Sequence, residues 1–306
     1  MSDIKIFRYG SDGVWELPST SVAVEKSLQS LIERHLEAFL GVRFLASEHT
    51  TGKTHGGRLD TLGIDENSQP VIIEYKRALN ENVINQGLYY LNWLMDHKAE
   101  FKLLVLDRYG KAAADAIEWG SPRLLCIAGD FTKFDEHAIE QIPRSIELIR
   151  YRRYDNDLLL FELVNATTEE PRGNETSGAG KKSKPKPTGK TVTDDLAQAS
   201  SDVQDRYAAL DAFLKALGDD IQLNTLKYYF AYKRIKNFAC VEVHPQPKRI
   251  VVFAKVDPDQ VVLQPGFTRD VRTVGHYGTG DLEITIDDDE SLERAKPLLF
   301  KSYNVS

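Results

Sequence analysis

The sequence predicts an α/β protein in which two folded regions are joined by a polar linker. Over the first half of the chain, apolar runs of strand length alternate with amphipathic helical segments. A stretch rich in Gly, Pro and Lys, from Thr167 to Ser200, then interrupts the apolar pattern. Short strand-like runs between two helical segments follow it. We therefore expect a mixed sheet flanked by helices over residues 1–165, a flexible Lys-rich linker over 166–200 and a smaller α+β domain over 201–306.

The first region is expected to begin with a short strand over Asp3–Arg8. Val22–Leu40 has apolar residues at helical spacing and stops at Gly41, which predicts an amphipathic helix. A strand near Val42–Leu45 then leads to a hairpin. The later segments are expected to be helices at about Asn82–His97, Ala112–Trp119 and His137–Ile142, and strands at Phe101–Leu106, Arg123–Ala128, Ile146–Tyr151 and Leu158–Val164.

The second region is expected to open with a helix near Val203–Leu217, which Gly218 ends. A closing helix is expected at Leu292–Phe300. Between them we expect strands at about Lys227–Tyr232, Phe238–Val243, Arg249–Val256 and Leu282–Ile286.

The hairpin carries the residues most suggestive of chemistry. Val71–Lys76 alternates and is rich in branched residues, so Glu74 and Lys76 are expected on the same face of one strand. The turn is indicated by the polar run from Asp65 to Pro70. A turn centred near Asn67 and Ser68 makes paired positions sum to about 135, which places Asp60 opposite roughly residue 75. Two carboxylates and a lysine are then expected on one patch.

Carboxylates side by side repel each other, so such a pair usually shares a cation or a proton. Oxygen ligands suit Mg²⁺ or Mn²⁺, and Mg²⁺ keeps several waters when one or two carboxylates hold it. Such an ion can clamp a phosphodiester and supply a bound water as the nucleophile. Lys76 would orient or deprotonate that water and balance charge in the transition state. The alternative is a surface hairpin with an ordinary Glu–Lys pair.

Asp60, Glu74 and Lys76 match the three motif positions of the PD-(D/E)XK nuclease superfamily, which this region resembles. The stretch from about Val24 to Leu94 is similar to the catalytic domain of the mismatch-cleaving endonuclease family. Four further segments carry the likeness: Val24–Gln29, Ala46–Thr50, the Gly-Gly-Arg approach to Asp60, and Gln86.

The resemblance implies a restriction-endonuclease-like fold and metal-dependent hydrolysis of DNA. It also implies that Glu25 is a further acidic residue near the metal and that Gln86 positions water or phosphate. The backbone carbonyl of Tyr75 would complete the metal shell. The domain usually fused to the mismatch enzymes is not recognisable in the sequence, so mismatch specificity does not follow. The second region resembles a compact domain of unknown function that often follows such nuclease domains; some relatives are labelled transport proteins, which no feature here supports.

Basic residues suggest where nucleic acid would bind. Lys53 and Arg58 lie just before Asp60, in the approach to the hairpin. Aromatic residues alternate with cations over Lys227–Phe238, where stacking on bases and neutralisation of phosphate are one interpretation. The other interpretation is ordinary strand packing. The cations concerned are Lys233, Arg234 and Lys236.

Composition limits the classes of protein that fit. The formal net charge of −7 is awkward for DNA binding, although a local basic track can coexist with an acidic body. No apolar stretch approaches the roughly 18 residues of a membrane span, and the N-terminus lacks a signal pattern. The two cysteines, Cys126 and Cys240, lie one in each half, so a reducing, cytoplasmic compartment is expected.

The sequence therefore predicts a Mg²⁺- or Mn²⁺-dependent DNA endonuclease, acting in restriction of foreign DNA or in DNA repair. DNA is the expected partner, a homodimer is possible, and no membrane association is expected. Two alternatives stay open. One is a nuclease acting on RNA or on branched or damaged structures, and the other is an inactive nucleic-acid-binding module with the same fold.

Overall fold

The computed structural model describes residues 4–20, 26–52, 56–76, 83–155, 157–168 and 190–306, with only the backbone of Thr20 and Lys76. The chain divides into two compact units, Met1–Glu169 and Glu170–Ser306, which we call the N-terminal and C-terminal units. The N-terminal unit holds a mixed sheet with helices, and the C-terminal unit holds a separate antiparallel sheet with helices. The predicted fold class is therefore confirmed. No helix within the described ranges is both long and apolar enough to cross a bilayer.

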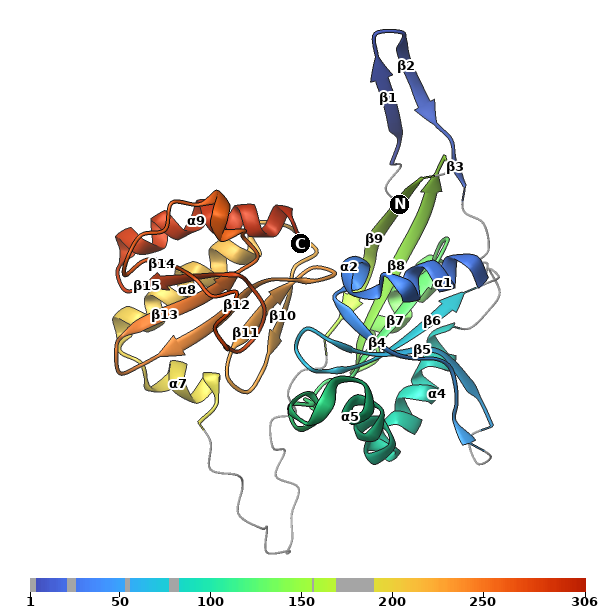
Figure 1. The fold of residues 1–306 in the computed structure, drawn as a ribbon, viewed down its shortest axis with the longest axis horizontal. Coiled ribbons are helices and arrows are strands. Elements are labelled where there is room, and N and C mark those ends of the chain that lie inside the picture. Colours follow the sequence, from blue (N-terminus) through green and yellow to red (C-terminus); the bar gives the residue numbers. More distant parts are fainter. Residues whose placement is uncertain (1–3, 21–25, 53–55, 77–82, 156, 169–189) are drawn as a thin grey trace, which may run out of the picture. The chain divides into compact units, whose positions relative to one another are not determined.

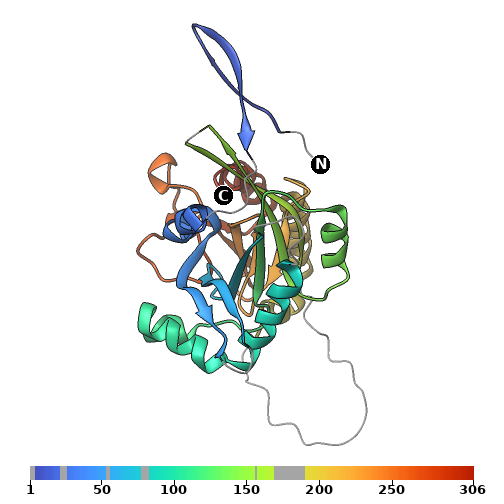
Figure 2. The ribbon, with the colours of Figure 1, turned by 90° about the vertical axis from the view of Figure 1, so that its right-hand side faces the viewer.

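The N-terminal unit is built on a seven-stranded sheet. Its central strands β6, β7 and β8 run parallel, while β3, β4, β5 and β9 join antiparallel to their neighbours. Figures 1 and 2 show these strands with helices on both sides of the sheet. A separate hairpin precedes the sheet and consists of β1 (Ile6–Gly10) and β2 (Gly13–Leu17). In sheet order the strands are β3 (Ser19–Thr20), β8 (Ser145–Tyr154), β7 (Arg123–Ala128), β6 (Pro70–Lys76), β5 (Arg58–Asp65) and β4 (Val42–Thr50), with β9 (Leu158–Thr167) paired to β8.

Strand alternation places the helices of this unit on opposite faces of the sheet. Ile72 belongs to the core cluster that includes residues of α4 (Val83–Asp96) and α5 (Lys98–Asp115). Its neighbour Ile73 pairs with Thr61, whose hydroxyl contacts α1 (Lys26–Arg34). Because successive side chains of a strand point to opposite faces, α1 lies across the sheet from α4 and α5. The other helices in the described part of this unit are α2 (Leu36–Leu40) and α6 (Lys133–Glu140).

Two expectations about local structure were wrong. The expected strand at Phe101–Leu106 is part of α5. Phe101 and Val105 are fully buried, whereas Leu103 and Leu106 are exposed, and this spacing buries one face of a helix. The expected long helix over Val22–Leu40 is divided between α1 and α2, because His35 has non-helical angles. Its predicted stop is confirmed, since Gly41 ends α2 with φ 64°.

The C-terminal unit holds a six-stranded sheet whose neighbouring strands are all antiparallel. Core residues from its helices pack with one face of this sheet. The sheet order is β10 (Gln222–Thr225), β11 (Phe230–Lys233), β12 (Asn237–His244), β13 (Arg249–Ala254), β15 (Leu282–Ile286) and β14 (Thr268–Asp270). The helices are α7 (Val192–Gln198), α8 (Ser201–Lys215) and α9 (Asp289–Asn304), with the short 3₁₀ helix η1 (Pro258–Gln260).

Regular secondary structure occupies both ends of the range 166–200, which was expected to be a linker. Helix α7 lies within that range, and β9 continues to Thr167. Thr191 and Asp194 form a reciprocal capping box at the start of α7, and Val192 is buried in the core. A capped helix with a buried residue is not linker. The rest of the expected linker, residues 169–189, lies outside the described residues.

Candidate functional site: a carboxylate pair on the hairpin

The side chain of Asp65 fixes the turn between β5 and β6. Its Oδ1 accepts hydrogen bonds from the backbone N–H of Asn67 at 2.9 Å and of Gln69 at 2.8 Å. Ser68 takes a left-handed conformation at φ 60°, which closes the turn. In the resulting register Thr61 pairs with Ile73. Asp60 therefore lies opposite Glu74, one residue from the position that the sequence predicted.

Asp60 and Glu74 are joined through backbone hydrogen bonds. The N–H of Asp60 donates to Glu74 Oε1 at 3.1 Å, and Asp60 Oδ2 accepts from the N–H of Tyr75 at 3.0 Å. Glu74 is fully buried and Asp60 is half-buried. The structure thus brings together the two carboxylates that the sequence singled out, in a place partly withdrawn from water.

The other predicted catalytic residues are placed less completely. Lys76 is the last residue of β6, two positions after Glu74, and only its backbone is described. Gln86 is exposed in the first turn of α4. Glu25 lies outside the described residues. Tyr75 is buried, and its peptide N–H binds Asp60, so its main chain adjoins the carboxylate pair.

A further carboxylate, Glu33 on α1, reaches the hairpin and was missed by the sequence analysis. Its Oε1 accepts hydrogen bonds from Thr61 Oγ1 at 2.6 Å, Ser47 Oγ at 2.8 Å and Gln29 Nε2 at 3.0 Å. The Gln29 amide also donates to the backbone carbonyl of Asp60 at 3.4 Å. Gln29 and Glu33 are four residues apart on a helix, a spacing visible in the sequence. Which turn of α1 faces the hairpin depends on tertiary packing.

The three carboxylates contribute negative charge around Tyr75. Burial raises the pKa of the Tyr75 hydroxyl above its ordinary value. The charges of Glu33, Asp60 and Glu74 raise that pKa further. A site with this potential attracts cations.

The donor chemistry of the pair fits a hard divalent cation. Asp60 and Glu74 supply only oxygen, which suits Mg²⁺ or Mn²⁺, whereas zinc sites usually include nitrogen or sulfur. Within the described part of the chain, no group of three or more His, Cys, Asp or Glu side chains is arranged to hold a metal. Two carboxylates are enough for Mg²⁺, because that ion retains several of its waters.

Of the two residues near the hairpin that were predicted to bind nucleic acid, the structure describes one. Arg58 is exposed at the start of β5 and forms an ion pair with Glu48, with Nη1 and Oε2 2.9 Å apart. Lys26 also pairs with Glu48. Lys53 lies outside the described residues.

In the C-terminal unit, the burial of Lys233 argues against its interpretation as a phosphate contact. Lys233 is 1% exposed, because β11 is an interior strand between β10 and β12. Phe230 and Tyr232 on the same strand are also buried, as strand packing predicts. Arg234 pairs with Asp220, whose Oδ2 lies 2.7 Å from its Nε. The third predicted cation, Lys236, lies beyond the end of β11 and is half-buried.

Comparisons with known proteins cover both units. Residues 192–306 match the family described as "Domain of unknown function (DUF5655)", a match that begins at α7 and continues to the C-terminus. An "Uncharacterized protein" of Haemophilus influenzae (strain ATCC 51907 / DSM 11121 / KW20 / Rd) is 28% identical over 303 residues, which are 97% of this chain and 98% of that protein. No solved structure matches the chain. The similarity to the Haemophilus protein thus runs through both units, and neither description states an activity.

Proposed function

We propose that the N-terminal unit is a metal-dependent nuclease that hydrolyses phosphodiester bonds of DNA at Asp60 and Glu74, with Mg²⁺ or Mn²⁺ as its cofactor. One observation carries the proposal. The hairpin register sets Asp60 against Glu74, with Lys76 two residues further along the same strand. This is the order of residue types that the superfamily resemblance implies.

The surrounding residues prepare the pair to bind a cation. Tyr75 N–H holds one oxygen of Asp60, and Asp60 N–H holds one oxygen of Glu74, so neither carboxylate has to be ordered when the ion arrives. Glu33 restrains the same segment through Thr61. When bound, the metal ion would polarise the phosphodiester and supply a water of lowered pKa.

Lys76 has three roles in this proposal. Its ammonium would favour the ionised forms of the carboxylates and would offset the negative charge that develops on the phosphoryl oxygens. It is also the group that would orient the attacking water. Restriction of foreign DNA and DNA repair are the settings in which such an activity would serve.

The test is cleavage by the purified full-length chain. Supercoiled plasmid, linear duplex, single-stranded DNA and RNA are incubated with Mg²⁺, Mn²⁺, Ca²⁺ or EDTA. We expect cleavage of DNA with Mg²⁺ or Mn²⁺ and none with EDTA. Asp60→Asn and Glu74→Gln are each expected to lower the rate by several orders of magnitude.

Asp96→Asn is the matched control, because Asp96 is an exposed carboxylate at the end of α4. That variant should cleave at the wild-type rate. Undiminished cleavage in EDTA, or by Asp60→Asn, would contradict the proposal. Preferential cleavage of RNA would favour the first alternative, and metal-independent binding without cleavage would favour an inactive binding module.

A further inference from the structure

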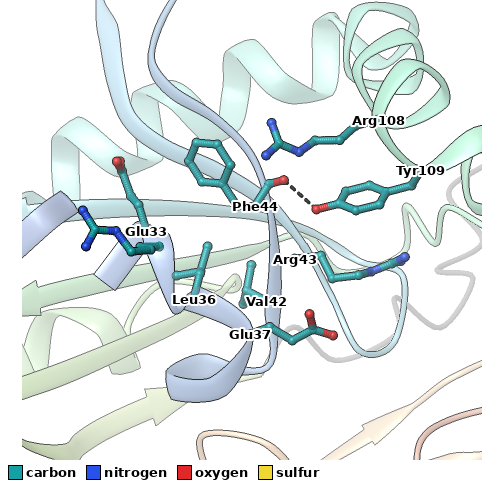
Figure 3. A pocket seen from close by; sticks show the side chains of 9 residues that line it. Glu33, Leu36, Glu37, Val42, Arg43, Phe44, Arg108 and Tyr109 are labelled. Atoms are coloured by element: carbon teal, nitrogen blue, oxygen red, sulfur yellow. Dashed lines mark hydrogen bonds between the residues drawn. The ribbon is translucent and has the colours of Figure 1, made fainter. Parts of the chain in front are cut away.

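A groove in the N-terminal unit concentrates arginine and aromatic side chains. It lies between α1, α2, β4 and α5 and has a volume of about 390 Å³ (Figure 3). Three arginines and two aromatic residues of its lining carry the argument below: Arg34, Arg43, Phe44, Arg108 and Tyr109. None of them belongs to the hairpin site.

Two of the arginines are held by reciprocal stacking between β4 and α5. The guanidinium carbon of Arg43 lies 4.8 Å from the centre of the Tyr109 ring, and that of Arg108 lies 4.8 Å from the centre of the Phe44 ring. The Tyr109 hydroxyl donates to the Phe44 carbonyl at 2.7 Å, the dashed line in Figure 3. Arg108 Nη1 donates to the Leu45 carbonyl at 3.4 Å. A guanidinium stacked on a ring can still present its other edge N–H groups to a ligand.

Two glycines make this arrangement possible. Helix α5 is interrupted at Gly110, where φ is 81°, so Arg108 and Tyr109 lie in the last turn before the break. Gly63 on β5 lies opposite Phe44. A Cβ at Gly63 would lie 2.4 Å from a methyl carbon of Val42 and 2.9 Å from the Arg43 carbonyl oxygen, so only glycine lets β4 come this close.

The groove arginines are not neutralised by ion pairs with other residues that the structure describes. Among the described residues, no carboxylate lies within ion-pair distance of Arg34, Arg43 or Arg108, although Glu33 and Glu37 also line the groove. Elsewhere in the unit, Arg123 and Arg150 are each paired with two carboxylates. The groove arginines therefore differ from the structural ones.

We propose that this groove binds the phosphate backbone of the nucleic acid whose cleavage is proposed above, an inference that rests on that function. Planar guanidinium forks match phosphate oxygens in pairs, and fixing them by stacking lowers the entropy lost on binding. Glu33 lines the groove and binds Thr61, the neighbour of Asp60 in β5, so the groove borders the strand that carries Asp60. A local cationic track is also what a chain of net charge −7 needs in order to hold DNA.

The test separates binding from cleavage. Affinity of the full-length chain for a short fluorescein-labelled DNA duplex is measured by anisotropy over a range of salt concentrations, with Ca²⁺ replacing Mg²⁺. Arg43→Gln combined with Arg108→Gln is expected to weaken binding about tenfold or more and to lower the log–log salt slope by about two units, roughly one per phosphate contact. Arg34→Gln, which disturbs no stacked pair, is expected to lower the slope by about one unit.

The matched control removes two arginines from a distant strand of the same sheet. Arg152 and Arg153 lie on β8, which is separated from β4 by three strands, and Arg152→Gln with Arg153→Gln removes the same charge. This control is expected to bind as wild type does. Equal losses in the control, or wild-type slopes in both the Arg34 variant and the groove double variant, would overturn the inference. The inference would also be overturned if the groove double variant lost binding of poly-glutamate but kept wild-type binding of duplex. That result would indicate an acidic protein partner.

The two proposals fail in different ways. A wild-type chain that binds duplex but does not cleave it, together with groove variants that bind weakly, would remove the proposed catalysis and leave the groove assignment standing. A wild-type chain that cleaves, together with groove variants that bind duplex normally, would do the opposite. A wild-type chain that binds no nucleic acid would overturn the groove assignment.

Discussion

Arg123 on β7 donates through Nη1 to Oδ2 of Asp65, 2.8 Å away, and both side chains are buried. The other oxygen of Asp65 accepts the backbone N–H groups that close the β5–β6 turn. Arg123 also binds both oxygens of Glu147, at 2.8 and 2.9 Å. Burial disfavours the charged guanidinium, yet Glu147 and Asp65 raise the pKa of Arg123 above its ordinary value. A buried ion cluster thus fixes the turn whose register sets Asp60 against Glu74.

Replacing Arg123 with Met is expected to destabilise the N-terminal unit by about 3–5 kcal/mol, because two buried carboxylates lose their cation. The change is read from urea unfolding followed by tryptophan fluorescence, since Trp15, Trp93 and Trp119 all lie in this unit. Lys102→Met is the control, because it removes a cation from an exposed pair with Asp115. It should change stability little. Equal midpoints for the Arg123 and Lys102 variants would contradict a structural role for the cluster.

Glu33→Ala is expected to destabilise the same unit by about 1–3 kcal/mol, because the fully buried hydroxyl of Thr61 loses its acceptor. Metal-dependent cleavage should fall as well, since Thr61 adjoins Asp60. Ser47→Ala is the control, because it removes an exposed donor to the same Glu33 oxygen and water can replace it. Unfolding midpoints and initial cleavage rates give the two readouts. A Glu33→Ala chain with wild-type stability would show that the contacts of Glu33 are incidental.

The hairpin could be predicted from the sequence because its determinants are local. Alternation in Val71–Lys76 and turn residues from Asp65 to Pro70 place the register within one residue. The contact of Glu33 could not be predicted, because it depends on how α1 packs across the sheet. Pairing between Arg43–Phe44 and Arg108–Tyr109 is equally non-local, since it joins a strand to a helix more than sixty residues later.

Errors arose where a short apolar run fits two structures. Phe101–Leu106 has the length and composition of a strand, and only the exposure of Leu103 and Leu106 reveals the helix. Lys233 follows a run of aromatic residues, and its burial results from the strands paired on either side of β11. Charged side chains are usually exposed, but a charged residue on a strand that is paired on both sides can be buried.

Lys233→Ala is expected to destabilise the C-terminal unit by at least about 2 kcal/mol, because a fully buried side chain is truncated. The salt dependence of DNA binding should stay unchanged, in contrast to the groove variants. Arg249→Ala is the control, because Arg249 is an exposed cation at the start of β13. Hydrogen exchange of β12, next to β11 in the sheet, measures the stability. A flatter salt slope without loss of protection would restore the phosphate-binding interpretation.

The C-terminal unit is expected to lose stability in alkaline solution through a hydrogen-bonded pair of tyrosines, of which Tyr232 is buried and Tyr207 is partly buried. The hydroxyls of Tyr207 and Tyr232 lie 3.2 Å apart, and Tyr232 donates to Asp211 Oδ1 at 2.7 Å. Burial raises the pKa of Tyr207 from 10.0 to about 12, and Asp211 also raises it. The folded unit therefore holds the phenolic proton more tightly than the unfolded chain does. Stability from this proton is complete below about pH 10 and is lost as pH rises through about 12.

Urea unfolding followed by circular dichroism at about pH 8 and about pH 11 measures the loss. Tyr207→Phe should reduce the pH dependence, whereas Tyr228→Phe, at an exposed ring, should leave it unchanged. An identical loss in wild type and Tyr207→Phe would place the alkaline sensitivity elsewhere in the chain.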